Sequence, residues 1–136
     1  MAAQDRSSSI QALERAPFAA MLGLKIESAA NGSATVRMPF DPRILNEGGP
    51  GAPIHGGAIA ALADVAACAA VWSLAETTRT ATISLTVNYT GFAVNSDLIA
   101  RARVKRTGKR IASLTVEIAD ASDAVIADAL VTYKIA

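Results

Sequence analysis

The sequence has few of the residues that build disulfides and metal centres. It contains one cysteine, one histidine and one tryptophan in 136 residues, and aromatic side chains make up 4% of the chain. A single cysteine excludes an intramolecular disulfide and favours a reducing, cytoplasmic location. A chain of this length can bury a core without a structural metal, so we expect one domain over residues 1–136, with residues 1–7 flexible and no metal site.

The sequence also lacks an excess of charge and a long hydrophobic run. Thirteen basic and twelve acidic residues leave a formal charge of +1, which predicts neither nucleic acid nor an anionic membrane as a partner. No run approaches the ~18 uninterrupted apolar residues of a membrane span, because Asp64 divides the most apolar segment. The first residues, MAAQDRSSSIQALERA, contain no apolar signal segment. We therefore expect a soluble, cytoplasmic protein.

Two helices are predicted. Residues 8–22 combine Ser8, as an N-cap, with apolar residues at helical spacing, and Pro17 interrupts them. Residues 55–74 lack any internal helix breaker and are rich in alanine and leucine, which predicts a helix of about five turns. Asp64 is the only charge in this second helix. We therefore expect the second helix to be buried on nearly all sides.

Strands are predicted on both sides of the long helix. Residues 22–29 and 33–40 flank Asn31 and Gly32, a dipeptide typical of tight β-hairpin turns. The glycine- and proline-rich residues 41–53 predict a long loop.

After the helix, apolar and polar residues alternate with a period of two. In the first of these strands one face would hold Ala81, Ile83, Leu85, Val87 and Tyr89, and the other Thr82, Ser84, Thr86 and Asn88. Three further strands are expected at 98–106, 111–119 and 124–136. This order predicts an α+β fold, in which an antiparallel sheet of five to six strands wraps around the long helix.

Asp64 and two glycines are the candidate chemical groups of that helix. An ionised carboxylate in an apolar setting is costly unless it is paired. Asp64 therefore lies at an exposed edge of the helix, makes a hydrogen bond across an interface, or acts as a base or nucleophile. Gly56 and Gly57 stand where the helix begins, and first-turn amides can bind an oxyanion. Gly56 and Asp64 lie about 12 Å apart along one helix at ~1.5 Å per residue. A two-fold dimer that brings Asp64 of one subunit to Gly56 of the other would complete a site.

The stretch NEGGPGAPIHGGAIAALAD resembles the signature of hotdog-fold thioesterases of the phenylacetate-degradation type. In that family an Asn precedes His-Gly-Gly, and an Asp follows the His by nine residues, as Asp64 follows His55. The resemblance covers nearly the whole chain. It implies a homo-oligomer, either a dimer or a tetramer made of two dimers, with its active site at the dimer interface. It also implies an acyl-CoA thioesterase that uses no cofactor, because coenzyme A is part of the substrate.

The resemblance also implies roles for individual residues. Asp64 would be the nucleophile or general base, and the Gly56 amide would polarise the thioester carbonyl. Asn46 would assist, Thr82 would hold water or the Asp, and His55 would shape the turn before the oxyanion amide. The chain departs from the family at one point, because Asn46 stands nine residues before His55 instead of six. Either the extra residues bulge out and return Asn46 to the site, or Glu47 lines the entrance instead.

Other residues have weaker claims to function. Gly57 offers a second amide to a substrate. Arg106, Lys109 and Arg110 are candidates for binding coenzyme A phosphates, although such residues also occur on solvated strand faces. Cys68 follows Asp64 by one helical turn, and we interpret it as a small core residue. Two alternatives remain: a non-catalytic acyl-thioester binding protein, which Asp at position 64 disfavours, and a hydratase, which would need a differently placed Asp and His pair.

Overall fold

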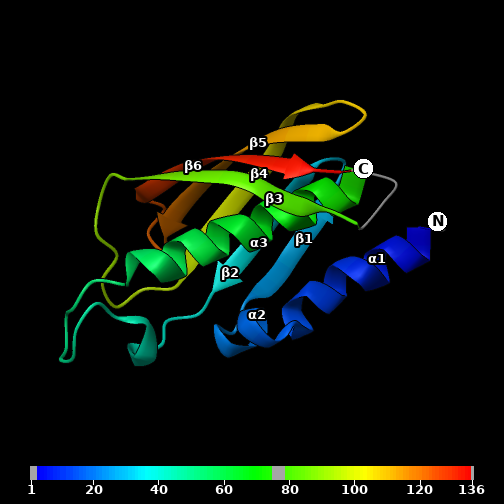
Figure 1. Cartoon of the computed structure of the whole chain (residues 1–136). Helices are drawn as coiled ribbons and strands as arrows, with labels where there is room; N and C mark the ends of the chain where they lie inside the picture. The colour runs from blue at the N-terminus through cyan, green and yellow to red at the C-terminus, as the bar shows by residue number, and fades with distance from the viewer. Residues whose placement is uncertain (1–2, 75–78, 136) are drawn as a thin grey trace.

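The computed structural model describes residues 3–74 and 79–135. A sheet of six strands wraps around one long helix, as the sequence predicts (Figure 1). In chain order the elements are α1 (Ala3–Ala12), η1 (Leu13–Arg15), α2 (Pro17–Met21), β1 (Lys25–Ala30), β2 (Ser33–Met38), η2 (Pro42–Ile44), α3 (Gly56–Leu74), β3 (Ala81–Tyr89), β4 (Leu98–Thr107), β5 (Ile111–Asp120) and β6 (Val125–Lys134).

Every strand pair in the sheet is antiparallel, and the strand order is β1-β2-β4-β5-β6-β3. The last three strands form the expected meander, while β3 crosses over to pair with the far side of β6. β1 and β3 are therefore the two edges. Figure 1 shows α3 between them, with β1 and β2 on one side and β3 and β6 on the other. This is the hotdog arrangement implied by the resemblance.

The first hairpin is closed by Asn31 and Gly32. Both residues have positive φ angles, 53° and 82°. Glycine adopts such angles without strain and asparagine tolerates them better than most residues, which is why this dipeptide selects a two-residue turn. A side chain at Gly32 would also lie 3.2 Å from Leu74 at the end of α3. The turn therefore closes the hairpin and makes room for the central helix.

The core helix α3 carries an apolar surface that the sheet covers. Nine of its residues are buried: Ala58, Ile59, Leu62, Ala63, Ala66, Ala67, Ala69, Ala70 and Val71. The helix is long and apolar enough to cross a membrane, but here it packs against strands of the sheet. Its small alanine side chains allow the strands to approach closely. One stripe of α3 is less buried, and Asp64 lies on it.

The N-terminal segment differs in detail from its prediction. The expected N-cap Ser8 lies inside α1, which already begins at Ala3, because the polar residues before Ser8 also accept helical geometry. Pro17 breaks the segment as predicted, and it occupies the first turn of α2, where its missing N–H costs nothing. The Glu14 carboxylate accepts a hydrogen bond from the Ile26 backbone N–H at 2.6 Å. This contact ties the segment to the edge strand β1.

The long loop between β2 and α3 is pinched at its base. Leu45 and Ile54 form an isolated β-bridge, and the Asn46 N–H donates to the Pro53 carbonyl at 2.9 Å. Residues 47–51 project from this base and are exposed. The additional loop residues are therefore accommodated as an excursion that starts and returns at the same place.

Candidate active site

Asp64 is held by two hydroxyl groups. Its Oδ1 accepts hydrogen bonds from the Thr82 hydroxyl at 2.8 Å and from the Tyr133 hydroxyl at 2.6 Å. Thr82 and Tyr133 are Cα partners across β3 and β6. Hydrogen bonds to an ionised acceptor are stronger than those between neutral groups. The side chain that the sequence marks as costly is thus paired, but it stays partly exposed to solvent.

A β-bulge explains how Thr82 reaches Asp64. The alternation in the sequence predicts that Thr82 lies with Ser84 on the polar face of β3, away from the helix. This prediction is wrong for Thr82, which faces α3. The register shifts between Thr82 and Ser84, so Ile83 is an extra residue on β3, and its side chain is 55% exposed. Such a bulge redirects the side chains on either side of it. Thr82 therefore shares the helix-facing side of the strand with Leu85 and Tyr89.

Among the described residues, one amide at the tip of α3 is unpaired. The Gly57 N–H donates to Nδ1 of His55 at 2.8 Å, so His55 acts as a helix cap. In neutral His55 this leaves the proton on Nε2. No hydrogen-bond acceptor for the Gly56 N–H is found within residues 3–74 and 79–135. The candidate oxyanion donor Gly56 is therefore available, whereas Gly57 is already satisfied by His55.

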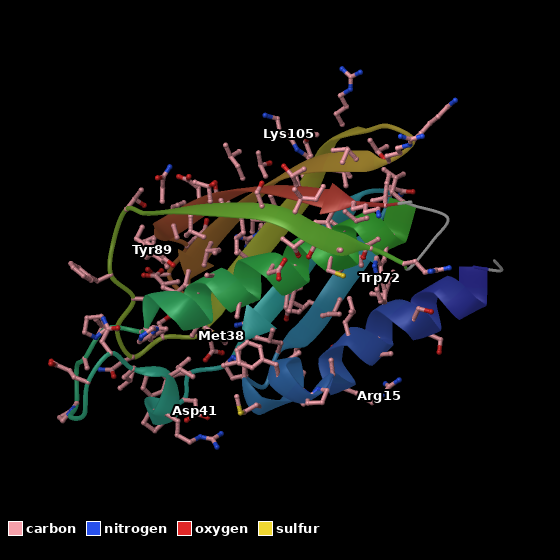
Figure 2. The ribbon with its side chains drawn as sticks, viewed as in Figure 1. Arg15, Met38, Asp41, Trp72, Tyr89 and Lys105 are labelled. Atoms are coloured by element: carbon pink, nitrogen blue, oxygen red, sulfur yellow. The ribbon has the colours of Figure 1, made fainter. Side chains whose placement is uncertain are left out.

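Tyr89 packs directly on Gly56. Its hydroxyl donates to the Gly56 carbonyl at 2.8 Å, and a Cβ at Gly56 would lie 3.2 Å from Cζ of the Tyr89 ring. Glycine is thus the residue that fits beneath this ring without displacement. Figure 2 shows Tyr89 beside the first turn of α3, at the end of β3.

A pocket of about 140 Å³ opens at this helix tip. Its lining includes Asn46, Gly56 and Tyr89, together with apolar residues from the β3–β4 loop such as the 80% exposed Phe92. The loop excursion thus returns Asn46 to the neighbourhood of Gly56. Glu47, the alternative candidate for the entrance, is exposed and does not line this pocket.

The basic residues gather elsewhere. Arg106, Lys109 and Arg110 line a surface cavity of about 480 Å³ at the β4–β5 turn. Ile111 in this cavity pairs with Lys134, which in turn pairs with Ala81 at the start of β3. The basic cavity therefore lies at the Thr82 end of the sheet, opposite the end that holds Tyr89.

Cys68 and Tyr133 lie beneath Asp64, and both remain protonated near neutral pH. Burial raises the pKa of the Cys68 thiol to about 12. Burial, followed by the neighbouring Cys68 and the hydrogen bond to Asp64, raises the pKa of Tyr133. A thiol is a poor nucleophile when it is not ionised, so the environment of Cys68 agrees with a core residue.

Sequence reasoning missed both tyrosines. Tyr133 occupies an inward position in the alternation of β6 and Tyr89 occupies one in β3, so each pattern indicates a core residue and nothing more. A buried tyrosine hydroxyl needs a partner, and this is the one signal that could have drawn attention to Tyr133. Its partner depends on strand register, which the pattern alone does not give.

Comparisons with known proteins agree with this architecture. A family model described as Thioesterase superfamily matches residues 53–127. A Halobacterium salinarum protein named "Putative esterase" is 35% identical over 109 residues, covering 76% of this chain and 72% of its own.

Solved structures show the same fold. The Escherichia coli PaaI protein from the phenylacetic acid degradation operon superposes with a TM-score of 0.85 at 23% identity, over 98% of this chain and 92% of its own. A hypothetical thioesterase from Streptococcus pneumoniae, solved with coenzyme A, has a TM-score of 0.74 at 21% identity, over 83% of this chain and 85% of its own.

Proposed function

Since this chain belongs to the thioesterase superfamily, we propose that it hydrolyses acyl-CoA thioesters at a site shared by two subunits. The observation that carries the proposal is the half-buried Asp64, the one carboxylate of an apolar core helix, held by a hydroxyl of the edge strand β3. In this proposal Asp64 is the nucleophile or the general base, and the Gly56 amide of the second subunit stabilises the oxyanion.

The exposed edge of β3 supports a dimer. Seven of its nine residues are exposed, and the strand carries no charged residue or proline to prevent pairing with another chain. The other edge strand, β1, contains Lys25 and Glu27, and its Ile26 N–H is already bound by Glu14. These features make β3, rather than β1, the edge strand that we propose pairs with a second copy of the chain.

An antiparallel pairing of β3 with its two-fold copy would bring the two halves of the site together. In one chain Thr82 binds Asp64 near the start of β3, and Tyr89 packs on Gly56 at its end. An isologous antiparallel pair places the end of one strand beside the start of the other. Gly56 of the second subunit would then lie near Asp64 of the first, which is what a shared site requires.

The reaction follows from these positions. Either a carboxylate oxygen of Asp64 attacks the thioester carbon, or it removes a proton from a water that attacks. In both routes the carbonyl electrons move to oxygen, where the Gly56 N–H stabilises the charge. Collapse breaks the C–S bond, and coenzyme A leaves as a thiolate that takes up a proton. Direct attack gives a mixed anhydride, which water then hydrolyses to the free acid.

The remaining site residues would bind and orient the substrate. Asn46 lines the pocket that contains Gly56, where its side-chain amide would donate to the same oxyanion, while His55 fixes the turn through Gly57. Arg106, Lys109 and Arg110 would bind the phosphates of coenzyme A. In the proposed dimer their cavity lies at the end of the sheet that receives the second subunit's Gly56. The pneumococcal structure solved with coenzyme A supports this substrate class.

Release of free thiol from a panel of acyl-CoA esters tests the proposal. Asp64→Asn should lower turnover at least about 100-fold, as expected when a central catalytic group is removed. Asp128→Asn, an exposed site on β6, is the matched control and should behave like the parent. Equal turnover by Asp64→Asn would refute the role of Asp64. Saturable binding of the esters with no turnover by the parent would instead indicate an acyl-thioester binding protein.

A further inference from the structure

The two oxygens of the Asp64 carboxylate have different surroundings. Oδ1 accepts two hydrogen bonds, from Tyr133 at 2.6 Å and from Thr82 at 2.8 Å. Among residues 3–74 and 79–135, no hydrogen-bond donor and no cation contacts Oδ2. A carboxylate oxygen has about two lone-pair positions, so both positions on Oδ1 are used. Within the described part of the chain, Oδ2 is the Asp64 oxygen whose lone pairs stay free for chemistry.

Tyr133 is positioned to keep Oδ1 of Asp64 hydrogen-bonded and to leave Oδ2 free. Its side chain is 3% exposed, and its hydroxyl also lies 2.9 Å from the backbone carbonyl of Asp64. The single hydroxyl proton is directed to the ionised oxygen at the shorter distance, where a charge-assisted bond is strongest. Burial raises the pKa of Tyr133, so the hydroxyl remains a donor throughout the neutral range.

The carboxylate needs two donors to stay in one orientation. Rotation about the terminal bond of an aspartate side chain is broad, because that torsion has no narrow staggered minima. A bond from Thr82 alone comes from an exposed edge strand, whereas Tyr133 comes from β6, which is paired on both sides. The rigid partner therefore anchors the carboxylate, and the bulge at Ile83 brings the second donor to the same atom.

We propose that Tyr133 is a positioning residue that, together with Thr82, makes Oδ2 of Asp64 the reacting oxygen. The inference rests on the proposed thioesterase function and specifies which atom performs it. In direct attack, the Oδ2 lone pair forms the C–O bond while the C=O π electrons move to the carbonyl oxygen, and the C–S electron pair leaves with sulfur when this oxyanion collapses. In the general-base route, Oδ2 takes the water proton while the water oxygen bonds to the carbonyl carbon. Oδ1 keeps both hydrogen bonds in either route.

Tyr133→Phe is the direct test, because it removes the hydroxyl and keeps the ring that fills the core. We expect kcat for thioester hydrolysis to fall about 10-fold or more, since a misplaced reacting group loses its alignment with the substrate. KM should change by less than about twofold, because Tyr133 does not touch the substrate in this proposal. Thr82→Val should act in the same direction, and Thr82→Ser should restore activity by returning the hydroxyl.

Two further measurements separate positioning from a loss of structure. In an Asp64→Asn background, Tyr133→Phe should cause no additional loss, because a residue that acts through Asp64 has nothing left to position. Thr132→Val removes a hydroxyl from the neighbouring position of β6, on the opposite face, and should leave kcat unchanged. Thermal unfolding of each variant establishes that it is folded.

The outcomes distinguish this inference from the proposed function. If the parent is active, Asp64→Asn is inactive and Tyr133→Phe keeps the parent kcat, the positioning role is overturned and the thioesterase assignment stands. An added loss from Tyr133→Phe in the Asp64→Asn background also overturns it. If the parent hydrolyses no thioester, both proposals are wrong.

Discussion

The Tyr89 hydroxyl donates to the Gly56 carbonyl 2.8 Å away, and the same ring covers the space where a side chain at position 56 would stand. This contact fixes the tip of α3 against the end of β3. It also leaves the Gly56 N–H as the free donor of the first turn within the described part of the chain. In the proposed function this N–H is the oxyanion donor, and the Tyr89 ring leaves little room for a side chain at position 56.

Gly56→Pro tests the amide itself. Gly56 is the first residue of α3, a position where proline is tolerated, and proline removes the N–H. We expect kcat/KM to fall about 100-fold, the cost of one oxyanion donor. Gly56→Ala is the matched control, because it adds a Cβ beside Tyr89 but keeps the N–H. Steady-state kinetics with one acyl-CoA should give a kcat/KM for the alanine variant well above that of the proline variant. Equal losses of kcat/KM would show that crowding against Tyr89, and not the missing N–H, causes the loss.

A shared site predicts complementation between two inactive variants. Asp64→Asn and Gly56→Pro, unfolded and refolded together, form mixed dimers with one site made of two unchanged halves. Random pairing then recovers about a quarter of the parent activity for an isologous dimer. Each variant refolded alone is the control. A mixture no more active than its components would place Asp64 and Gly56 of each site in the same chain.

Pairing through β3 predicts that Ile83→Lys weakens the dimer. The Ile83 side chain is 55% exposed on the bulge of the edge strand, and a charged lysine on such an edge opposes pairing with another strand. Analytical ultracentrifugation should show a shift to monomer together with lower turnover. Val125→Lys introduces the same charge at another exposed apolar residue, at the start of β6 and outside the β3 strand, and should keep the parent's association state. Loss of association in Val125→Lys alone would place the interface elsewhere.

The basic cavity predicts an effect that depends on the nucleotide of the substrate. Lys109→Glu combined with Arg110→Glu should raise KM for an acyl-CoA about 10-fold or more, because phosphate contacts are lost and charges of like sign are introduced. Hydrolysis of the matching acyl-pantetheine, which lacks the nucleotide, should not change. Lys105→Glu, on the same hairpin outside the cavity, is the control (Figure 2). Equal effects on both substrates would exclude a role in nucleotide binding.

Cys68 predicts how stability depends on alkaline pH. Its folded-state pKa of about 12 lies above the reference value of 9.0, so between these values the unfolded chain loses a proton that the folded chain keeps. The free energy of unfolding should therefore fall as pH rises through this window, by up to about 1.4 kcal/mol per pH unit. Urea unfolding at pH 8 and 10.5 should show a steeper decline for the parent than for Cys68→Ala. Equal declines in the free energy of unfolding for the parent and Cys68→Ala would contradict the raised pKa of Cys68.

Much of the fold is local in origin, and so it can be predicted. The Asn31–Gly32 turn, the break at Pro17 and the breaker-free stretch of α3 each follow from the backbone preferences of a few adjacent residues. The same holds for the alternation in β4, β5 and β6, which follows from burying one face of a sheet. Ser8 shows the limit, because a capping residue is also acceptable inside a helix.

The sequence by itself determined the order of the elements, the apolar core helix and the isolation of Asp64 within it, because these depend on composition and local spacing. Only the tertiary structure decided which groups meet Asp64. The bulge at Ile83 turns Thr82 toward the helix, and the register of β6 places Tyr133 opposite it. Register and bulges arise from the packing of strands distant in sequence, and a one-residue shift changes which face every side chain occupies.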